Sequence, residues 1–63
     1  MELKEIMIKK GSRIECRETI NIIGQGELFT KNEMYDSPDN NCLTDNKGED
    51  LFITPNYLKY FYL

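Results

Sequence analysis

The sequence predicts one small all-β domain of about five strands, spanning residues 1–63. Its clearest local pattern is a β-hairpin over residues 41–53, in which Asp45-Asn46-Lys47-Gly48 places turn-forming side chains ahead of a glycine that accepts positive φ. Further turn-forming clusters divide the other apolar segments into short pieces. Because an isolated hairpin is only marginally stable in water, those segments must supply more strands and an apolar face.

The first nine residues alternate imperfectly between apolar and charged side chains. Ile6 and Ile8 have the spacing of one sheet face, which favours an edge strand, whereas Leu3 and Ile6 would suit a short helical turn that Gly11 ends. We take the edge strand as the prediction and keep the helical turn as its alternative.

A turn and a half-buried strand follow. Lys10-Gly11-Ser12 has turn-forming composition. The alternation of charged and apolar residues over residues 13–17 then directs Ile14 and Cys16 toward the core.

Residues 18–40 hold short apolar pieces separated by turns. A β-branched run over residues 19–23 leads to Gly24-Gln25-Gly26 and then to Leu28-Phe29-Thr30. This segment is either an added strand or one arm of a long folded-over loop. Residues 34–36 form a short extended piece, which ends at the turn-forming residues 37–40.

A break that contains a proline, at residues 54–56, precedes a strongly apolar end of the chain. Residues 57–63 predict a final strand, with Leu58, Tyr60 and Tyr62 on one face and Phe61 and Leu63 on the other. Such a strand would close the sheet into a barrel and hide an edge that could otherwise pair with another chain.

The order of these pieces resembles the small SH3-like barrels, and above all the short SH3-like proteins of tailed bacteriophages. The resemblance covers residues 10–63 and rests on motifs in the same order: Gly11, Cys16, residues 28–35, residues 44–48, Tyr57-Leu58 and Phe61. It implies an SH3-like barrel whose central hairpin turns at Asp45–Gly48. It also implies a phage accessory protein that binds and modulates or inhibits a host protein, and it supplies no catalytic residues.

The two cysteines, Cys16 and Cys42, match no redox or zinc-binding spacing. No segment with the features of an export signal precedes them. We therefore expect free thiols in a cytoplasmic protein, or in the host cytoplasm for a phage protein, with one disulfide as the alternative. No apolar run reaches the roughly 20 residues that span a bilayer, and no basic amphipathic helix is present, so we expect no membrane association.

The sequence lacks the residue combinations that catalysis and cofactor binding need. Histidine is absent, which leaves a cysteine nucleophile without its usual base. Gly24 and Gly26 lack the further glycine and the helix pattern of a dinucleotide site. A calcium loop centred on Gly48 would place Leu43 and Lys47 at ligand positions. We predict no enzymatic activity, no cofactor and no metal site.

Acidic side chains concentrate in the second half of the chain. Residues 1–31 carry a net charge of +1, whereas residues 32–63 carry six acidic and two basic side chains, a net charge of −4. A surface that binds phosphates concentrates lysine and arginine, so this distribution argues against nucleic acid. It favours a protein partner with a basic surface.

These observations predict a non-enzymatic protein-interaction module. Its expected contact surface combines acidic side chains with tyrosines that exceed what so small a core can bury: Glu33, Tyr35, Asp36, Asp45, Glu49, Asp50, Tyr60 and Tyr62. A second copy of the chain is an alternative partner, and a merely solvated acidic hairpin is the alternative interpretation of the cluster. The alternative function is a nucleic-acid-associated small β-barrel that uses a basic set: Lys9, Lys10, Arg13 and Arg17.

Overall fold

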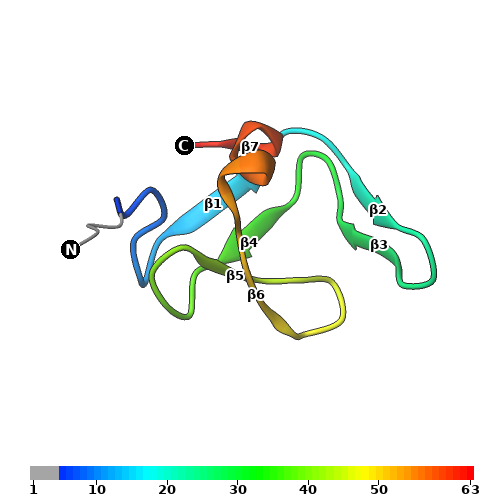
Figure 1. The fold of residues 1–63 in the computed structure, drawn as a ribbon, viewed down its shortest axis with the longest axis horizontal. Helices are drawn as coiled ribbons and strands as arrows, with labels where there is room; N and C mark the ends of the chain where they lie inside the picture. The colour runs from blue at the N-terminus through cyan, green and yellow to red at the C-terminus, as the bar shows by residue number, and fades with distance from the viewer. Residues whose placement is uncertain (1–4) are drawn as a thin grey trace.

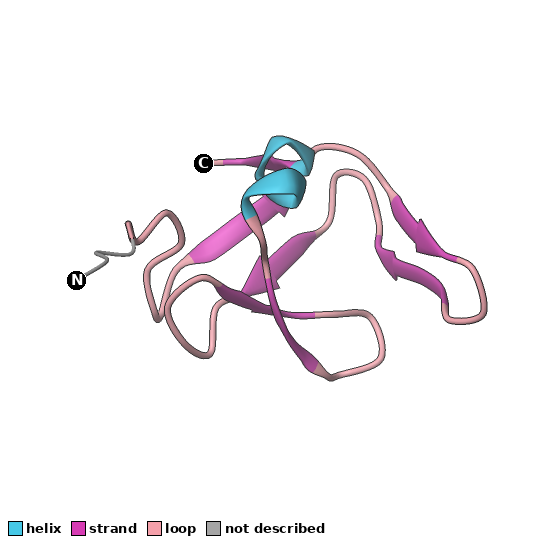
Figure 2. Cartoon of the chain, in the orientation of Figure 1, coloured by secondary structure: helices cyan, strands magenta, loops and turns pink. Residues whose placement is uncertain are grey.

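The computed structural model describes residues 5–63, which form seven short β-strands and one 3-10 helix (Figure 1, Figure 2). In chain order the elements are β1 (Arg13–Cys16), β2 (Ile20–Ile22), β3 (Gly26–Phe29), β4 (Met34–Asp36), β5 (Cys42–Thr44), β6 (Asp50–Phe52), η1 (Pro55–Tyr60) and β7 (Phe61–Tyr62). Strands dominate, so the predicted all-β class is confirmed.

The strands pair into three small antiparallel sheets. β1 lies between β4 and β7, β2 pairs with β3, and β5 pairs with β6. Within residues 5–63 these sheets do not close into a continuous hydrogen-bonded barrel, so a closed barrel of five strands is not confirmed. Each strand has only two to four residues, because turns that include several left-handed residues interrupt the chain at short intervals.

The segment around Gly24 forms a folded-over hairpin. β2 and β3 are its arms, and the N–H of Gln25 donates to the carbonyl of Ile22 at 2.9 Å across the turn. This hairpin stands apart from the other strands in Figure 1. The short extended piece predicted at residues 34–36 is β4, and the turn predicted after it also forms.

The central hairpin forms as predicted, with β5 and β6 paired in register. Its loop turns between Asp45 and Gly48, whose φ is +83°. The N–H of Gly48 donates to the Asp45 carbonyl at 3.0 Å. One carboxylate oxygen of Asp45 accepts the N–H groups of Lys47 and Glu49 at 2.8 and 2.9 Å. These bonds define a hairpin loop with glycine at its left-handed position.

The edge strand predicted for residues 1–9 does not form over residues 5–9, and residues 1–4 lie outside the described part of the chain. Ile6 and Ile8 do not share a face, because Ile8 is fully buried and Ile6 is 54% exposed. The Asn41 side chain takes the place of a partner strand. Its Oδ1 accepts the N–H groups of Met7 and Ile8 at 2.9 and 3.0 Å.

The end of the chain differs from the predicted final strand. Residues 55–60 form η1, and only Phe61 and Tyr62 continue as a strand, which pairs with β1. Pro55 explains the difference, because a proline at the start of a helix loses no hydrogen bond and its fixed φ suits the first turn. The three-residue period then brings Tyr57 and Tyr60 together, with ring centroids 5.8 Å apart.

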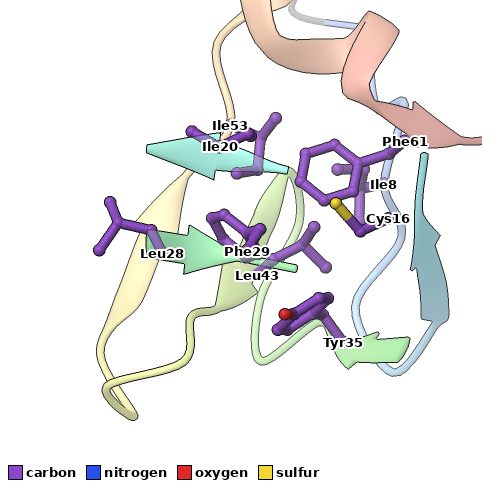
Figure 3. Close-up of a cluster of buried hydrophobic side chains, with 9 residues drawn as sticks. All are labelled: Ile8, Cys16, Ile20, Leu28, Phe29, Tyr35, Leu43, Ile53 and Phe61. Atoms are coloured by element: carbon purple, nitrogen blue, oxygen red, sulfur yellow. The ribbon is translucent and has the colours of Figure 1, made fainter. Parts of the chain in front are cut away.

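A cluster of buried side chains connects the three sheets (Figure 3). Phe29 contacts two other rings edge-on, with centroid separations of 4.8 Å to Tyr35 and 5.2 Å to Phe61. The other members come from every part of the described chain: Ile8, Cys16, Ile20, Leu28, Leu43 and Ile53. Ile14 packs against this cluster, so the inward direction predicted for Ile14 and Cys16 is confirmed.

A polar contact, which we call the Asn46 junction, joins the β2–β3 hairpin to the β5–β6 turn. The backbone N–H of Asn46 donates to the Leu28 carbonyl at 2.8 Å, and its Nδ2 donates to the Glu27 carbonyl and to Thr30 Oγ1, both at 3.1 Å. The Tyr35 hydroxyl donates to Asn46 Oδ1 at 2.7 Å and accepts the Thr30 N–H at 2.6 Å. The junction therefore holds two separate hairpins against each other.

Removal of the Tyr35 hydroxyl should weaken this junction. In Tyr35→Phe, the N–H of Thr30 and the Oδ1 of Asn46 lose a partner, so we expect the free energy of unfolding to fall by about 1–3 kcal/mol. Urea denaturation followed by circular dichroism measures the change. The matched control is Tyr62→Phe, whose side chain is 53% exposed and which should change stability by less than about 0.5 kcal/mol. Equal losses in the two variants would contradict the role assigned to the hydroxyl.

Candidate functional site

An apolar groove lies between the β2–β3 hairpin and the segment that runs from β6 into η1. Its volume is about 240 Å³, which is below the range of pockets that enclose drug-sized ligands. The side chains that line it are Ile20, Ile22, Gln25, Leu28, Phe29, Leu51, Phe52, Ile53 and Tyr57. Apart from Gln25 and the tyrosine hydroxyl, the lining side chains offer only apolar atoms.

The groove has a buried floor and an exposed rim. Core side chains form the floor, whereas Phe52 and Tyr57 on the rim are 53% and 38% exposed. Ile23, which follows the lining residue Ile22 at the tip of the β2–β3 hairpin, is fully exposed. Large apolar side chains therefore gather around one hollow and are not scattered singly over the surface.

The two hairpins that flank the groove carry acidic side chains, none of which is among the lining residues. Glu27 is the one ionisable side chain in residues 20–29, and Glu49 and Asp50 directly precede the lining residue Leu51. All three carboxylates belong to exposed residues, and none forms an ion pair within residues 5–63. Lys47 is the one basic residue on either hairpin. The groove is therefore an apolar hollow whose two flanking hairpins, which we call its acidic walls, carry Glu27 on one and Glu49 and Asp50 on the other, outside the lining itself.

Two residues of the predicted contact surface are structural. Tyr35 is 7% exposed and its hydroxyl belongs to the Asn46 junction. Asp45 is 6% exposed and its carboxylate accepts two N–H groups of the hairpin loop. Both side chains are buried in these contacts, whereas the predicted surface required them to be exposed. The sequence does not distinguish a turn-forming aspartate or a core tyrosine from an exposed one.

The four remaining acidic residues of the predicted surface are divided between two sheets. Glu33 and Asp36 belong to the region of β4, where Asp36 lies 3.7 Å from the guanidinium group of Arg13. Glu49 and Asp50 lie on the β5–β6 hairpin and directly precede the lining residue Leu51. Of this predicted acidic set, Glu49 and Asp50 are therefore the pair nearest in sequence to the groove lining.

Tyr60 and Tyr62, the other predicted contact residues, do not share a strand face. Tyr60 ends η1 and packs half-buried against the core. Tyr62 is exposed on β7, with the guanidinium carbon of Arg17 5.9 Å from its ring centroid. Neither lines the groove. The 3-10 helix separates residues that the predicted strand would have aligned.

Two of the four basic residues of the alternative function contact other side chains. Arg13 forms its ion pair with Asp36, and Arg17 stacks beside Tyr62. Residues 9–10 are exposed in the segment that precedes β1. The ion pair of Arg13 offsets part of the positive charge that phosphate binding would use.

Sequence reasoning missed the groove, including its rim residues Phe52 and Tyr57 and the lining residue Ile22. Each was assigned to a strand or to the closing of a barrel. One signal was present, because the β-branched run at residues 19–23 is more apolar than a solvent-facing hairpin arm requires.

Both cysteines are free thiols. The Sγ–H of buried Cys16 donates to the Glu18 carbonyl at 2.9 Å, whereas Cys42 is half-buried on β5. Burial raises the pKa of the Cys16 thiol, and the negative charge of Glu18 raises it further.

Within the described residues, no group of three or more cysteine, aspartate or glutamate side chains is placed to hold a metal ion. No helix in residues 5–63 has the length and apolar character needed to cross a membrane.

Comparison with known proteins adds no relative, because no protein family, no curated protein and no solved structure matches this chain. The candidate site therefore stands on its own geometry: an apolar hollow, an exposed rim and two acidic walls.

The two thiols should differ in reactivity. In the native protein, Cys42 should react with a chromogenic disulfide reagent at least about tenfold faster than Cys16, because the reaction requires an accessible thiolate and Cys16 is buried with a raised pKa. The variants Cys16→Ala and Cys42→Ala assign the two phases. Denaturation without reductant should then release two thiols per chain. Similar native rates, or fewer than two thiols, would contradict the structure.

Proposed function

We propose that this chain is a non-enzymatic protein-binding module whose contact surface is the apolar groove with its acidic walls. One observation carries the proposal: an apolar floor, exposed rim side chains and three carboxylates outside any ion pair of residues 5–63 occur together. The partner is a protein segment that places a large apolar side chain in the groove and a lysine or arginine beside its walls.

The apolar part of the groove supplies the affinity. Covering the exposed rings of Phe52 and Tyr57 removes apolar area from water, and aromatic side chains at the centre of an interface carry a large share of binding energy. Tyr57 is suited to this role because its neighbour Tyr60 lies against its ring at 5.8 Å. A ring that is already ordered loses little further conformational entropy on binding.

The acidic walls select for basic partners and raise the rate at which such partners associate. Glu27 accepts the Thr30 hydroxyl at 2.5 Å, and Asp50 accepts the Thr44 hydroxyl at 2.9 Å. These neutral contacts orient each carboxylate and leave its charge uncompensated. Carboxylates at the rim of an apolar contact attract basic partners from a distance and repel acidic ones.

A defined probe can test the groove without knowledge of the natural partner. Selection from a random displayed peptide library against the wild-type chain should enrich peptides that carry lysine or arginine near a large apolar residue. A selected peptide should bind Tyr57→Ala at least about tenfold more weakly, as expected for truncation of an interface anchor. Fluorescence anisotropy measures the affinity, and circular dichroism verifies that the variant is folded.

Tyr62→Ala is the matched control, because Tyr62 is exposed but lies outside the groove. Its affinity for the same peptide should stay within about twofold of wild type. Peptides that lose affinity for Tyr62→Ala and keep it for Tyr57→Ala would place binding on the three-stranded sheet and overturn the proposal.

Neutralising one groove wall should slow association. The double variant Glu49→Gln/Asp50→Asn removes two charges and keeps an acceptor for the Thr44 hydroxyl. At low salt, the association rate of a selected cationic peptide should fall several-fold, and its salt dependence should become shallower, since exposed charges are screened within about 8 Å at physiological ionic strength. Stopped-flow fluorescence measures these rates.

The control for this experiment is Glu33→Gln/Asp36→Asn, which makes the same change in net charge on the other sheet. It should slow association less than the groove-wall variant does. Equal slowing by both double variants would show that total charge, and not the groove walls, attracts the peptide.

A further inference from the structure

Residues 5–8, which we call the N-terminal strap, attach to the fold without a strand or a helix. Ile8 is fully buried in the core cluster, whereas Glu5, Ile6 and Met7 are exposed. The side chains of the strap therefore hold it to the rest of the described chain mainly through one residue.

Asn41 supplies the polar half of the attachment. Its Oδ1 accepts the N–H groups of Met7 and Ile8, its Nδ2 donates to the Glu5 carbonyl at 3.2 Å, and its backbone N–H donates to the Ile8 carbonyl at 2.6 Å. All four bonds go to main-chain atoms of the strap. Asn41 and the hole that Ile8 fills thus form a socket, which binds an extended backbone and one apolar side chain.

A tight turn connects the strap to β1. The N–H of Ser12 donates to the Lys9 carbonyl at 3.0 Å, and Gly11 has a φ of +88°. No atom lies within 4 Å of the position that a Cβ would occupy on Gly11, so backbone conformation alone favours glycine there. The N–H groups of Lys10 and Gly11 also donate to Asn40 Oδ1 and to the Ser37 carbonyl, at 3.0 and 2.9 Å, so closure of the strap combines these bonds with one left-handed residue.

From this geometry we infer that the strap socket is also an intermolecular site, and that its occupant is the strap of a second copy of the chain. A strap that opens at the turn of residues 9–12 leaves an apolar hole and the Asn41 amide unfilled. The strap of a second copy satisfies both, while the first strap fills the second socket. The result is a two-fold exchanged dimer whose socket contacts are those seen within one chain.

The complementarity of this occupant is displayed by the structure itself, because the same four residues already fill the socket. In dilute solution the chain's own strap prevails, since a short connection gives it an effective concentration of about millimolar. A substitution that destabilises the tight turn shifts the equilibrium from the closed monomer toward the exchanged dimer. This inference does not depend on the groove.

Gly11→Val tests the inference. A β-branched residue rarely adopts positive φ, so the substitution penalises the closed strap, and an extended connection in the exchanged dimer relieves that penalty in both copies. Each relieved turn is worth about a factor of ten, so the dimer association constant should rise roughly a hundredfold over wild type. Sedimentation equilibrium measures this constant.

Gly24→Val is the matched control. Gly24 also has a φ of +88° and no atom within 4 Å of a Cβ position, but it lies at the tip of the β2–β3 hairpin and connects no strap. Its association constant should stay close to that of wild type. Gly11→Asn, which tolerates the left-handed conformation better, should be monomeric.

Adding Ile8→Ala to Gly11→Val should lower the free energy of unfolding of the closed monomer and of the exchanged dimer alike, because the same buried side chain fills the socket in both states. The association constant should therefore stay close to that of Gly11→Val. A folded Gly11→Val chain that associates no more than wild type would overturn the inference. So would a Gly11→Val dimer whose resistance to urea unfolding is unaffected by Ile8→Ala.

Native-state hydrogen exchange of the wild-type chain provides a test that requires no variant. The amides of Met7 and Ile8 should exchange through an opening that is insensitive to low urea, whereas the Cys16 amide, bonded to the Glu33 carbonyl at 2.9 Å, should exchange through a larger unfolding. Exchange of the Ile8 amide through global unfolding alone would show that the strap does not open separately, and the inference would fail.

Discussion

The Asn46 junction holds the β2–β3 hairpin against the β5–β6 hairpin, and the groove lies beside this contact. The β2–β3 hairpin shares no strand ladder with the other two sheets, and a two-stranded hairpin alone is marginal in water. It is held by core side chains such as Phe29 and by the hydrogen bonds that Asn46 makes to Leu28, Glu27 and Thr30. Because the groove lies between this hairpin and β6, the contact that stabilises the fold also sets the separation of the groove walls.

Two asparagine side chains supply hydrogen bonds between segments that longer paired strands would supply in a larger domain. Asn41 bonds the N-terminal strap through both ends of its amide, whereas Asn46 bonds the β2–β3 hairpin through its Nδ2 and Tyr35 of β4 through its Oδ1. Every buried side-chain nitrogen or oxygen in the described residues has a hydrogen-bond partner. A chain of this size buries a modest fraction of its surface, so such polar attachments are a substantial part of what fixes its architecture. The apolar rim at Phe52 and Tyr57 stays exposed even though the chain has little apolar surface to bury in its core, which fits the proposed binding role.

Local chemistry explains which features could be predicted. The hairpin at Asp45–Gly48 depends on turn residues adjacent in sequence, and the strand around Ile14 depends on alternation, so both were accessible from sequence. The strap and the Asn46 junction depend on side-chain to main-chain bonds between distant segments, which no periodic pattern encodes. The same limit explains the groove. Pattern reasoning identified exposed tyrosines and acidic hairpin residues, but it could not tell that Tyr35 faces the core while Tyr57 faces the hollow.

The central claim, that the groove between the two hairpins is where a partner binds, is tested most directly by nuclear magnetic resonance of the chain bound to a cationic peptide with one large apolar residue. Intermolecular nuclear Overhauser effects report which side chains touch that residue. The account predicts contacts to the methyl groups of Ile22 and Leu51 and to the ring of Tyr57. Contacts confined to the exposed residues of the three-stranded sheet, Met34 and Tyr62, would contradict it.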